Sequence, residues 1–259
     1  MRARKKEKSK SLGLAIYFGF FVFLIIVISF LFKSIDTIRK SRFDGNNRFT
    51  VALFLKEKTD IVSISPKEGT LKKLRIASVT TPKGVRTLSI PVDSHVNYDS
   101  EFSYSTKLYF LKMLLNKRNF KTDLSTFDLL KLSIYSLKIS DENIKEESLP
   151  TDENSQKVLL SNLFIDEAIA SEKLKIQITN ATKVSGLGNK IARYLSSMGA
   201  NVVLVNSSKD TLEKSKIIYI KESYTLKKIS QVLKVPNEKG NTSYISDILL
   251  IVGEDLGEF

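Results

Sequence analysis

The chain has 259 residues and a formal net charge of +13, with 41 Lys and Arg residues against 28 Asp and Glu residues. It contains no cysteine, which excludes disulfide bonds and thiolate metal ligands. It also lacks tryptophan, whereas proteins that bind single-stranded nucleic acids combine basic grooves with stacking aromatic residues. The length leaves room for one or two small domains, and the charge does not predict nucleic acid as a partner.

The most apolar stretch, residues 12–32, contains no charged side chain. As an α-helix it would be about 31 Å long, enough to cross the hydrocarbon core of a bilayer. A buried core helix would show a polar stripe, and a cleaved signal peptide would have a shorter apolar run with small residues behind it. We therefore expect one transmembrane helix over residues 12–32, with the lipid bilayer as a partner.

Basic residues flank this stretch on both sides and hold more than half of the positive excess. The dense cluster in residues 1–11 predicts a cytoplasmic tail, because positive charge is retained inside. The pattern also fits attraction to anionic lipids. Residues 33–48 contain the turn sequence DGNN near their end and are expected to be a tether. The prediction is a single-pass cell-membrane protein with residues 33–259 outside the cytoplasm.

Short runs rich in β-branched residues follow, separated by turns that contain Pro and Gly. Strands are expected over residues 49–55, 60–65, 73–79 and 86–92. Turns are expected over residues 66–69 and 81–84. Apolar spacing then predicts helices over residues 106–115 and 125–138. Ser125 suits the N-cap of the second helix, with Asp128 in its first turn. Residues 49–149 are therefore expected to form a small α/β domain.

A polar, acidic stretch at residues 141–157 predicts a domain boundary, and Pro150 lies inside it. Residues 150–171 are expected to form a linker and one helix that ends near residue 170. The inward residues expected of this helix are Val158, Leu159, Leu163 and Ile169.

Residues 172–259 show the most regular pattern of the chain. The expected elements are strands over 174–179, 201–206, 215–220 and 247–252, and helices over 187–198 and 224–235. Gly199 suits a left-handed end of the first helix, and Pro236 stops the second. The order βαββαβ predicts a small sheet with both helices on one face, so the expected fold class of the chain is α/β (α+β).

Residues 174–255 resemble the LytR C-terminal domain. The resemblance is carried by residues 176–182 (IQITNAT), 184–187 (VSGL), 198–203 (MGANVV) and 251–255 (IVGED), and by the strand that ends at Tyr219. The join at residues 163–172 also resembles the segment that leads into this domain in membrane-anchored members. The resemblance implies a protein of the cell envelope.

Residues 50–149 resemble a shortened LytR-CpsA-Psr catalytic domain, from a family that transfers glycopolymers from a polyprenyl pyrophosphate carrier to the cell wall. Residues 60–66 (DIVSISP) resemble its strand with an Asp-Pro turn, and residues 89–96 (SIPVDSHV) resemble its Ser-Ile-Pro-Arg-Asp-Thr-x-Val motif. The Arg that would bind pyrophosphate falls at Val92, which offers phosphate no charge and no donors. Asp93 remains, without that cation beside it. The resemblance therefore implies a degenerate domain.

The turn before the first C-terminal helix holds the candidate binding residues. Gly186 and Gly188 suggest a dinucleotide site, but Ile191 stands at the third glycine position and no acid follows at the expected distance. An N-cap at Ser185 and a tight turn at Gly186 explain the motif without a ligand. A helix start can also hold an anion through its free N–H groups. The residues of this hypothetical site for an anionic glycan are Asn180, Lys183, Ser185, Gly186 and Lys190.

No catalytic site is predicted. His95 is the only histidine, and the sequence gives it no activating context for a Ser-His-Asp arrangement. Asp93 with Asp99 or Glu101 is a conceivable carboxylate pair, but a solvated loop is the simpler explanation. No cluster of His, Asp and Glu has metal-ligand spacing, so neither a metal nor a cofactor is expected.

These patterns predict a membrane-anchored, non-catalytic envelope protein that binds wall glycopolymer or scaffolds envelope proteins. The main alternative is a phosphotransferase of the LytR-CpsA-Psr type that acts on polyprenyl-pyrophosphate-linked polymer through a shifted basic set, Arg75, Lys83 and Arg86. A third interpretation is an assembly module whose C-terminal sheet edge pairs with another protein.

Overall fold

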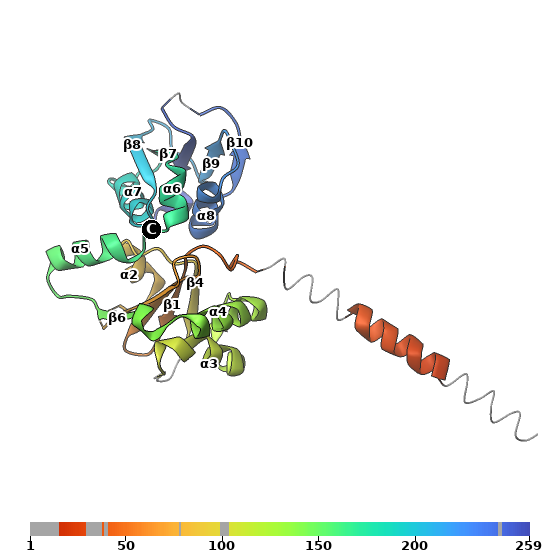
Figure 1. The fold of residues 1–259 in the computed structure, drawn as a ribbon. Helices are drawn as coiled ribbons and strands as arrows, with labels where there is room; N and C mark the ends of the chain where they lie inside the picture. Colours follow the sequence, from red (N-terminus) through yellow and green to blue (C-terminus); the bar gives the residue numbers. More distant parts are fainter. Residues whose placement is uncertain (1–15, 30–37, 39–40, 78, 99–103, 243–244) are drawn as a thin grey trace, which may run out of the picture.

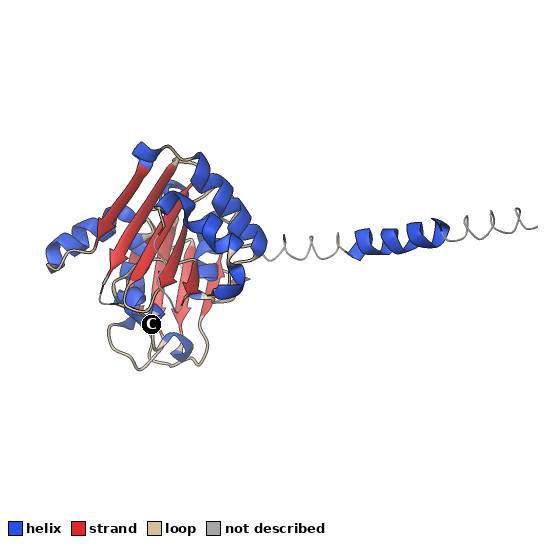
Figure 2. Ribbon diagram, turned by 90° about the horizontal axis from the view of Figure 1, so that it is seen from below, coloured by secondary structure: helices blue, strands red, loops and turns tan. Residues whose placement is uncertain are grey.

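Two mixed β-sheets organise this computed structural model, one in each half of the chain (Figure 1). The structure describes residues 16–29, 38, 41–77, 79–98, 104–242 and 245–259. We call residues 41–164 the N-terminal unit and residues 165–259 the C-terminal unit, because each range packs around its own sheet. Figure 2 shows the strands of both sheets in red, with helices beside them.

The N-terminal unit has a six-stranded sheet with the order β5-β4-β1-β2-β3-β6. Its strands are β1 (Phe49–Phe54), β2 (Thr59–Ser65), β3 (Thr70–Ile76), β4 (Ser94–Asn97), β5 (Lys121–Thr122) and β6 (Ile144–Ser148). The first three form an antiparallel meander, while β4 runs parallel to β1 and β6 runs parallel to β3. Every residue of β1 and β2 is buried, because helices cover both faces of the sheet.

Two layers of helices enclose this sheet. The core on one face is shared with α3 (Tyr109–Leu115) and α4 (Thr126–Lys138). The core on the other face is shared with α2 (Pro82–Thr87) and α5 (Glu153–Leu163). Short 3-10 turns cover Thr106–Leu108, Lys117–Asn119 and Asp141–Asn143. The expected helices over 106–115 and 125–138 are confirmed.

Two local expectations for this unit are wrong. Residues 86–92 are not a strand, and residues 81–84 are not only a turn, because α2 begins at Pro82. Thr81 accepts a hydrogen bond from the Gly84 N–H, and proline at the first helical position sacrifices no hydrogen bond. The strand comes later, as β4. The polar stretch at 141–157 likewise contains a strand, β6, which pairs with β3.

Asp128 fastens the start of α4 to the start of the unit. It forms the expected capping box with Ser125, in which each side chain accepts from the other residue's backbone N–H. Its second oxygen accepts hydrogen bonds from Ser41 Oγ at 2.7 Å and from the N–H groups of Arg42 and Phe43 at 3.0 Å. Phe43 is only 1% exposed and belongs to the core, so this end of the expected tether packs against the domain.

The C-terminal unit has a five-stranded sheet with the order β10-β9-β11-β7-β8. Its strands are β7 (Lys175–Asn180), β8 (Asn201–Ser207), β9 (Lys216–Tyr219), β10 (Asn237–Lys239) and β11 (Ile248–Val252). The helices α6 (Glu167–Glu172), α7 (Leu187–Ser197) and α8 (Tyr224–Leu233) share one core with the sheet. In Figure 1 these helices lie toward the N-terminal unit. The predicted βαββαβ order is confirmed, with β10 as an addition, and a final 3-10 turn covers Glu254–Leu256.

The single helix expected to end near residue 170 is divided into α5 and α6. Asp166 interrupts it, because its side chain accepts from the Ala168 N–H and caps a new helix. Leu163 and Ile169 are buried as expected, whereas Val158 is 66% exposed. The break lets α5 pack on the first sheet and α6 on the second.

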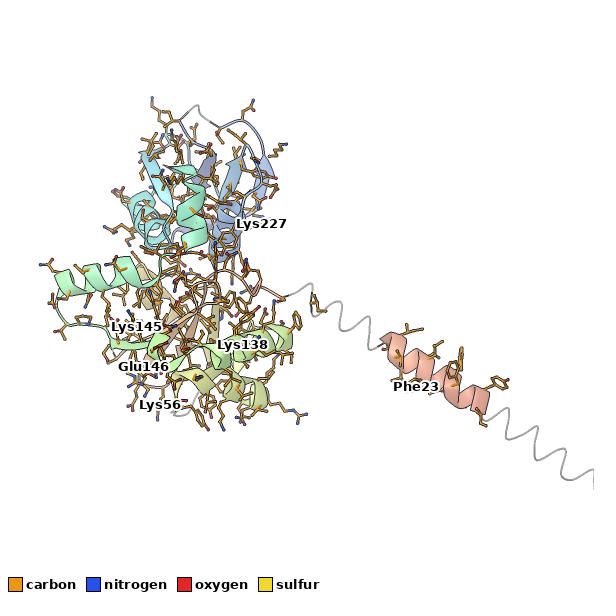
Figure 3. All side chains as sticks on the ribbon, in the orientation of Figure 1. Phe23, Lys56, Lys138, Lys145, Glu146 and Lys227 are labelled. Atoms are coloured by element: carbon orange, nitrogen blue, oxygen red, sulfur yellow. The ribbon has the colours of Figure 1, made fainter. Side chains whose placement is uncertain are left out.

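Residues 16–29 are helical and carry exposed apolar side chains, including Phe23, which Figure 3 labels. Within the described parts of the chain, no helix has both the length and the apolar character needed to cross a bilayer. The span expected over residues 12–32 also includes residues 12–15 and 30–32, which lie outside the described residues.

Candidate functional site

The predicted loop before α7 is held together by its own residues. The Asn180 side chain donates to the Val184 carbonyl at 3.0 Å and accepts from the Thr182 N–H at 3.2 Å. Gly186 has φ +76° and occupies the N-cap position of α7, with no side chain bonded there. The expectation that Ser185 caps the helix is therefore wrong, because a glycine in the left-handed conformation makes the turn instead.

Lys183, Ser185, Gly186 and Lys190 are all exposed around this loop. An acid also borders it, since the Lys183 N–H donates to Glu254 Oε1 at 2.9 Å. The Lys190 N–H donates to the Gly186 carbonyl at 3.1 Å, as an ordinary helical bond. The loop geometry is thus explained by internal hydrogen bonds, and its lysines stand on an open surface.

A more enclosed site lies where the two units meet. Lys228 of α8 places Nζ 2.7 Å from Asp93 Oδ1 and donates to the Arg48 carbonyl at 2.8 Å. The Asp93 and Lys228 side chains are only 4% and 10% exposed. Asp93 Oδ2 accepts from the Thr50 N–H at 2.8 Å, which fixes the carboxylate to β1. A buried ion pair therefore joins the C-terminal unit to the central strand of the N-terminal sheet.

Arg48 strengthens the same junction from the N-terminal side. Its Nε donates to the Ile165 carbonyl at 2.7 Å, and its Nη1 donates to Ser63 Oγ at 3.2 Å. The remaining Nη2 pairs with Glu68, while the side chain as a whole is 4% exposed. Because a guanidinium has donors in a fixed fork, one arginine can tie β2, the following turn and the start of the C-terminal unit together.

Helix α7 makes the next contacts across the junction. The Val92 N–H donates to Tyr194 Oη at 3.2 Å, and Ser197 Oγ donates to the Ser89 carbonyl at 2.7 Å. Tyr194 is fully enclosed and packs edge-on against Phe259. Burial raises the pKa of its hydroxyl well above the ordinary value, so the group stays protonated. The segment that resembles a phosphotransferase motif is thus bound by C-terminal residues.

A small cavity opens beside these contacts. Its volume is about 80 Å³, far below the roughly 300–1,000 Å³ typical of small-molecule pockets. Its charged and polar lining residues include Arg42, Arg86, Asp93, His95, Asp123 and Lys234. Arg86 also lies over the Phe259 ring at 5.6 Å. The cavity itself has room for one small charged group.

Asp123 is the electrostatic centre of the N-terminal wall of this cavity. It accepts a very short hydrogen bond from Ser94 Oγ and pairs closely with Arg42, while His95 Nδ1 lies 3.7 Å away. Burial opposes ionisation, but the Ser94 hydroxyl, Arg42 and His95 together hold the pKa of Asp123 below its ordinary value. The carboxylate is therefore charged at neutral pH.

Ser94, His95 and Asp123 gather here without forming a nucleophilic triad. A triad needs the histidine between the serine and the acid. Here the Ser94 hydroxyl donates its single proton directly to Asp123, and His95 does not stand between the two. Sequence reasoning missed Asp123 and Lys228 as partners of this site, because only the folded chain brings them to the segment around residue 93.

The alternative basic set does not converge. Arg75 pairs with Asp60 on β2 at 3.2 Å and does not line the cavity, and Lys83 is exposed 4.0 Å from Glu258. Arg86 alone belongs to the cavity wall. Asp99 and Glu101 lie outside the described residues. Among the residues that are described, no group of three His, Asp or Glu side chains is placed to hold a metal ion.

Comparison with known families assigns the C-terminal unit. Residues 173–256 match the model of the family described as LytR cell envelope-related transcriptional attenuator. The C-terminal unit is a LytR C-terminal domain. The match leaves out the N-terminal unit, and among curated proteins no match to the chain is found.

Two solved structures resemble the chain weakly. The transcriptional regulator yvhJ from Bacillus subtilis has 13% identity and a TM-score of 0.34, over 44% of this chain and 94% of that one. The Lmo1026 protein from Listeria monocytogenes has 11% identity and a TM-score of 0.29, over 41% of this chain and 83% of that one. Likeness at this level carries no argument about function. The LytR C-terminal domain match therefore rests on the sequence of residues 173–256.

Proposed function

We propose that this chain is a membrane-anchored, non-catalytic protein of the cell envelope. Its LytR C-terminal domain, together with the junction to the N-terminal unit, binds anionic groups of wall glycopolymer and scaffolds envelope proteins. No reaction is assigned to it.

The anchor is supported by residues 12–32, which contain no charge and are flanked by basic residues. Within this stretch, residues 16–29 are helical, and the side chains of Phe18, Phe20 and Phe21, which point to different sides of the helix, are 69%, 64% and 58% exposed. A helix that is apolar all round is favourable only where lipid or protein covers it. Lipid is the cover that we propose.

One observation carries the non-catalytic assignment: residues 92 and 93 are occupied in joining the two units. A phosphotransferase of the type that this segment resembles would need a guanidinium at residue 92 and an available acid at 93. Val92 instead donates its N–H to Tyr194, and Asp93 is paired with Lys228. A buried carboxylate with a paired ammonium has little freedom to serve a passing substrate.

The binding role is supported by the cations that remain at the cavity. Arg42 is paired with Asp123, and Asp93 is paired with Lys228, so those charges are balanced locally. Arg86 and Lys234 line the same cavity and form no ion pair among the described side chains. A single phosphate or carboxylate group of a long polymer would fit there, because the rest of the polymer can run outside.

Sedimentation with insoluble wall polymer tests this proposal on the full chain in detergent micelles. We expect Arg86→Gln combined with Lys234→Gln to lower the bound fraction several-fold. The loop hypothesis predicts the same loss for Lys183→Ala combined with Lys190→Ala. Lys56→Gln combined with Lys145→Gln is the matched control, because both lysines are exposed on the N-terminal unit (Figure 3). Equal losses for all three pairs would show non-specific charge attraction and contradict a site.

A further inference from the structure

Helix α4 has two rows of apolar residues. One row packs into the core, and the other faces outward. The residues that pack inward are Leu129, Leu132, Ser133 and Ser136, together with Asp128. Leu130, Ile134 and Leu137 point the other way, and each is 43% exposed. Phe127 continues this outer row at helical spacing and is half-buried. The exposed row is thus a continuous apolar surface along the helix, not a scatter of single residues.

The charged residues on this outer face are all basic. Lys131 and Lys138 flank the apolar row, and Figure 3 shows Lys138 on α4. Lys117 joins them at the helix start, where its Nζ donates to Thr126 Oγ1 at 2.7 Å. All 13 residues of α4 are described, and the acid among them, Asp128, is completely buried. Asp44 of the adjoining segment is exposed and interacts electrostatically with Lys131. The helix itself presents an apolar row with lysines and no exposed acid of its own, which is the composition of helices that lie in the surface of an anionic bilayer.

The chain enters the folded part of the protein beside this face. Ser41, Arg42 and Phe43 are bound to Asp128 in the first turn of α4. Lys131 on the outer face donates a short hydrogen bond to the Phe43 carbonyl. Whatever lies N-terminal to residue 41 therefore approaches the domain at the start of α4.

The length of the connecting chain limits how far this face can be from the anchor. If residues 12–32 span the bilayer, residues 33–40 link them to Ser41, with a reach of roughly 29 Å at full extension. Helix α4 itself is about 20 Å long. The outer face is therefore within reach of the membrane surface along its whole length. The sequence of this link holds Lys33, Arg39 and Lys40 against Asp36, so its net charge is positive.

We infer that the outer face of α4, formed by Phe127, Leu130, Lys131, Ile134, Leu137 and Lys138, rests on the surface of an anionic bilayer. The inference rests on the proposed membrane anchor, and it adds an orientation. The exposed apolar residues of α4 would contact the lipid headgroup region, so that the N-terminal unit lies on the membrane surface. A second copy of this chain is the competing occupant, because the apolar row also has coiled-coil spacing.

A fluorescent label on α4 tests the inference directly. The chain contains no cysteine, so Ile134→Cys gives a unique position for an environment-sensitive NBD label. Ile220→Cys is the matched control, because Ile220 is 51% exposed in the C-terminal unit. Each full chain is reconstituted into vesicles of phosphatidylcholine, with or without phosphatidylglycerol, that contain a doxyl-labelled lipid as quencher. Leu137→Cys serves as a second position on the same face.

We expect quenching at residues 134 and 137 to exceed quenching at residue 220 several-fold, and to increase with phosphatidylglycerol. Equal quenching at all positions would overturn the inference. A label shielded from water but not quenched by lipid would also overturn it, in favour of a second copy.

Alkaline carbonate extraction of the same vesicles tests the anchor separately. If the chain stays in the membrane fraction but α4 is not selectively quenched, the anchor is supported and the inference about α4 is wrong. Extracted chains that were selectively quenched beforehand would remove the anchor and leave α4 as a peripheral contact. Extracted chains without quenching would contradict both.

Discussion

Lys228 of the LytR C-terminal domain lies 2.7 Å from Asp93 of the N-terminal unit, within a segment that resembles a phosphotransferase motif. The cation that this acid would lack from its own motif is thus supplied by another domain. Two further hydrogen bonds join the units at this point. Lys228 donates to the Arg48 carbonyl, and the Val92 N–H donates to the Tyr194 hydroxyl. The segment around residues 92 and 93 therefore forms part of the contact between the two units.

Replacing Lys228 with methionine should separate this joint. Lys228→Met keeps the apolar stem but leaves the Asp93 carboxylate buried and unpaired, which costs about 3–5 kcal/mol of unfolding free energy. Urea unfolding of the full chain in detergent measures it. The double variant Lys228→Met with Asp93→Asn should recover much of the loss, because no charge remains buried. A double variant as unstable as the single one would contradict a role for this charge.

Asp128→Ala should release the start of the N-terminal unit. The substitution removes the capping box and the acceptor for Ser41, Arg42 and Phe43, and should cost about 2–4 kcal/mol. Trypsin should then cut after Arg42 several-fold faster. Ser125→Ala loses only the cap, about 1 kcal/mol, and should leave that cleavage slow. Equal cleavage in both variants would argue against Asp128 as the fastener.

Two acids should affect stability in acid in opposite directions. The lowered pKa of Asp123 means that its contribution is present above about pH 4 and is lost as pH falls through its folded-state pKa. Burial raises the pKa of Asp166 despite Lys228 and Tyr224 nearby, so the folded state gains a proton first and is favoured by acid. Asp123→Asn should make the unfolding free energy fall less steeply as pH is lowered, whereas Asp166→Asn should make it fall more steeply. Urea midpoints between about pH 3 and pH 6 measure both slopes, and parallel slopes would refute the assignment.

Gly253 should tolerate no side chain. A Cβ there would lie 2.6 Å from the Lys214 carbonyl carbon and 2.8 Å from the Ser215 nitrogen, so backbone would have to move. Gly253→Ala should therefore destabilise the LytR C-terminal domain by about 1–3 kcal/mol. Gly188→Ala is the control, because its nearest neighbour is a Val205 methyl group at 3.0 Å, and alanine favours the helix. Thermal unfolding of both variants gives the comparison.

Local patterns predicted the C-terminal unit well and the N-terminal unit in part. The βαββαβ order follows from alternation, helical spacing and the stops at Gly199 and Pro236, which are all local signals. The strand expected over 86–92 failed because Thr81 and Pro82 start a helix just before it. The outward face of α4 could not be assigned from spacing, since Leu129 and Leu130 each begin a plausible stripe. Burial decided between them when Ser133 and Ser136 packed inward.

The candidate site was mostly beyond local reasoning. Val92 and Asp93 were recognised from the motif, but their partners Tyr194 and Lys228 come from helices of another domain. A turn before α7 was expected and is present, but it is made by Gly186 and not by Ser185. Ligand binding by this loop stays a prediction. Contacts between distant segments depend on how the two sheets pack relative to each other. The spacing of residues within one segment does not predict that packing.

A turnover assay tests the central claim most directly. The full chain, reconstituted in vesicles, is incubated with a glycan linked to polyprenyl pyrophosphate and with magnesium, and release of the glycan from its carrier is followed. We predict no release above the protein-free rate, because residues 92 and 93 are committed to the joint between the two units. Magnesium-dependent release that is lost in Arg86→Gln would contradict the account.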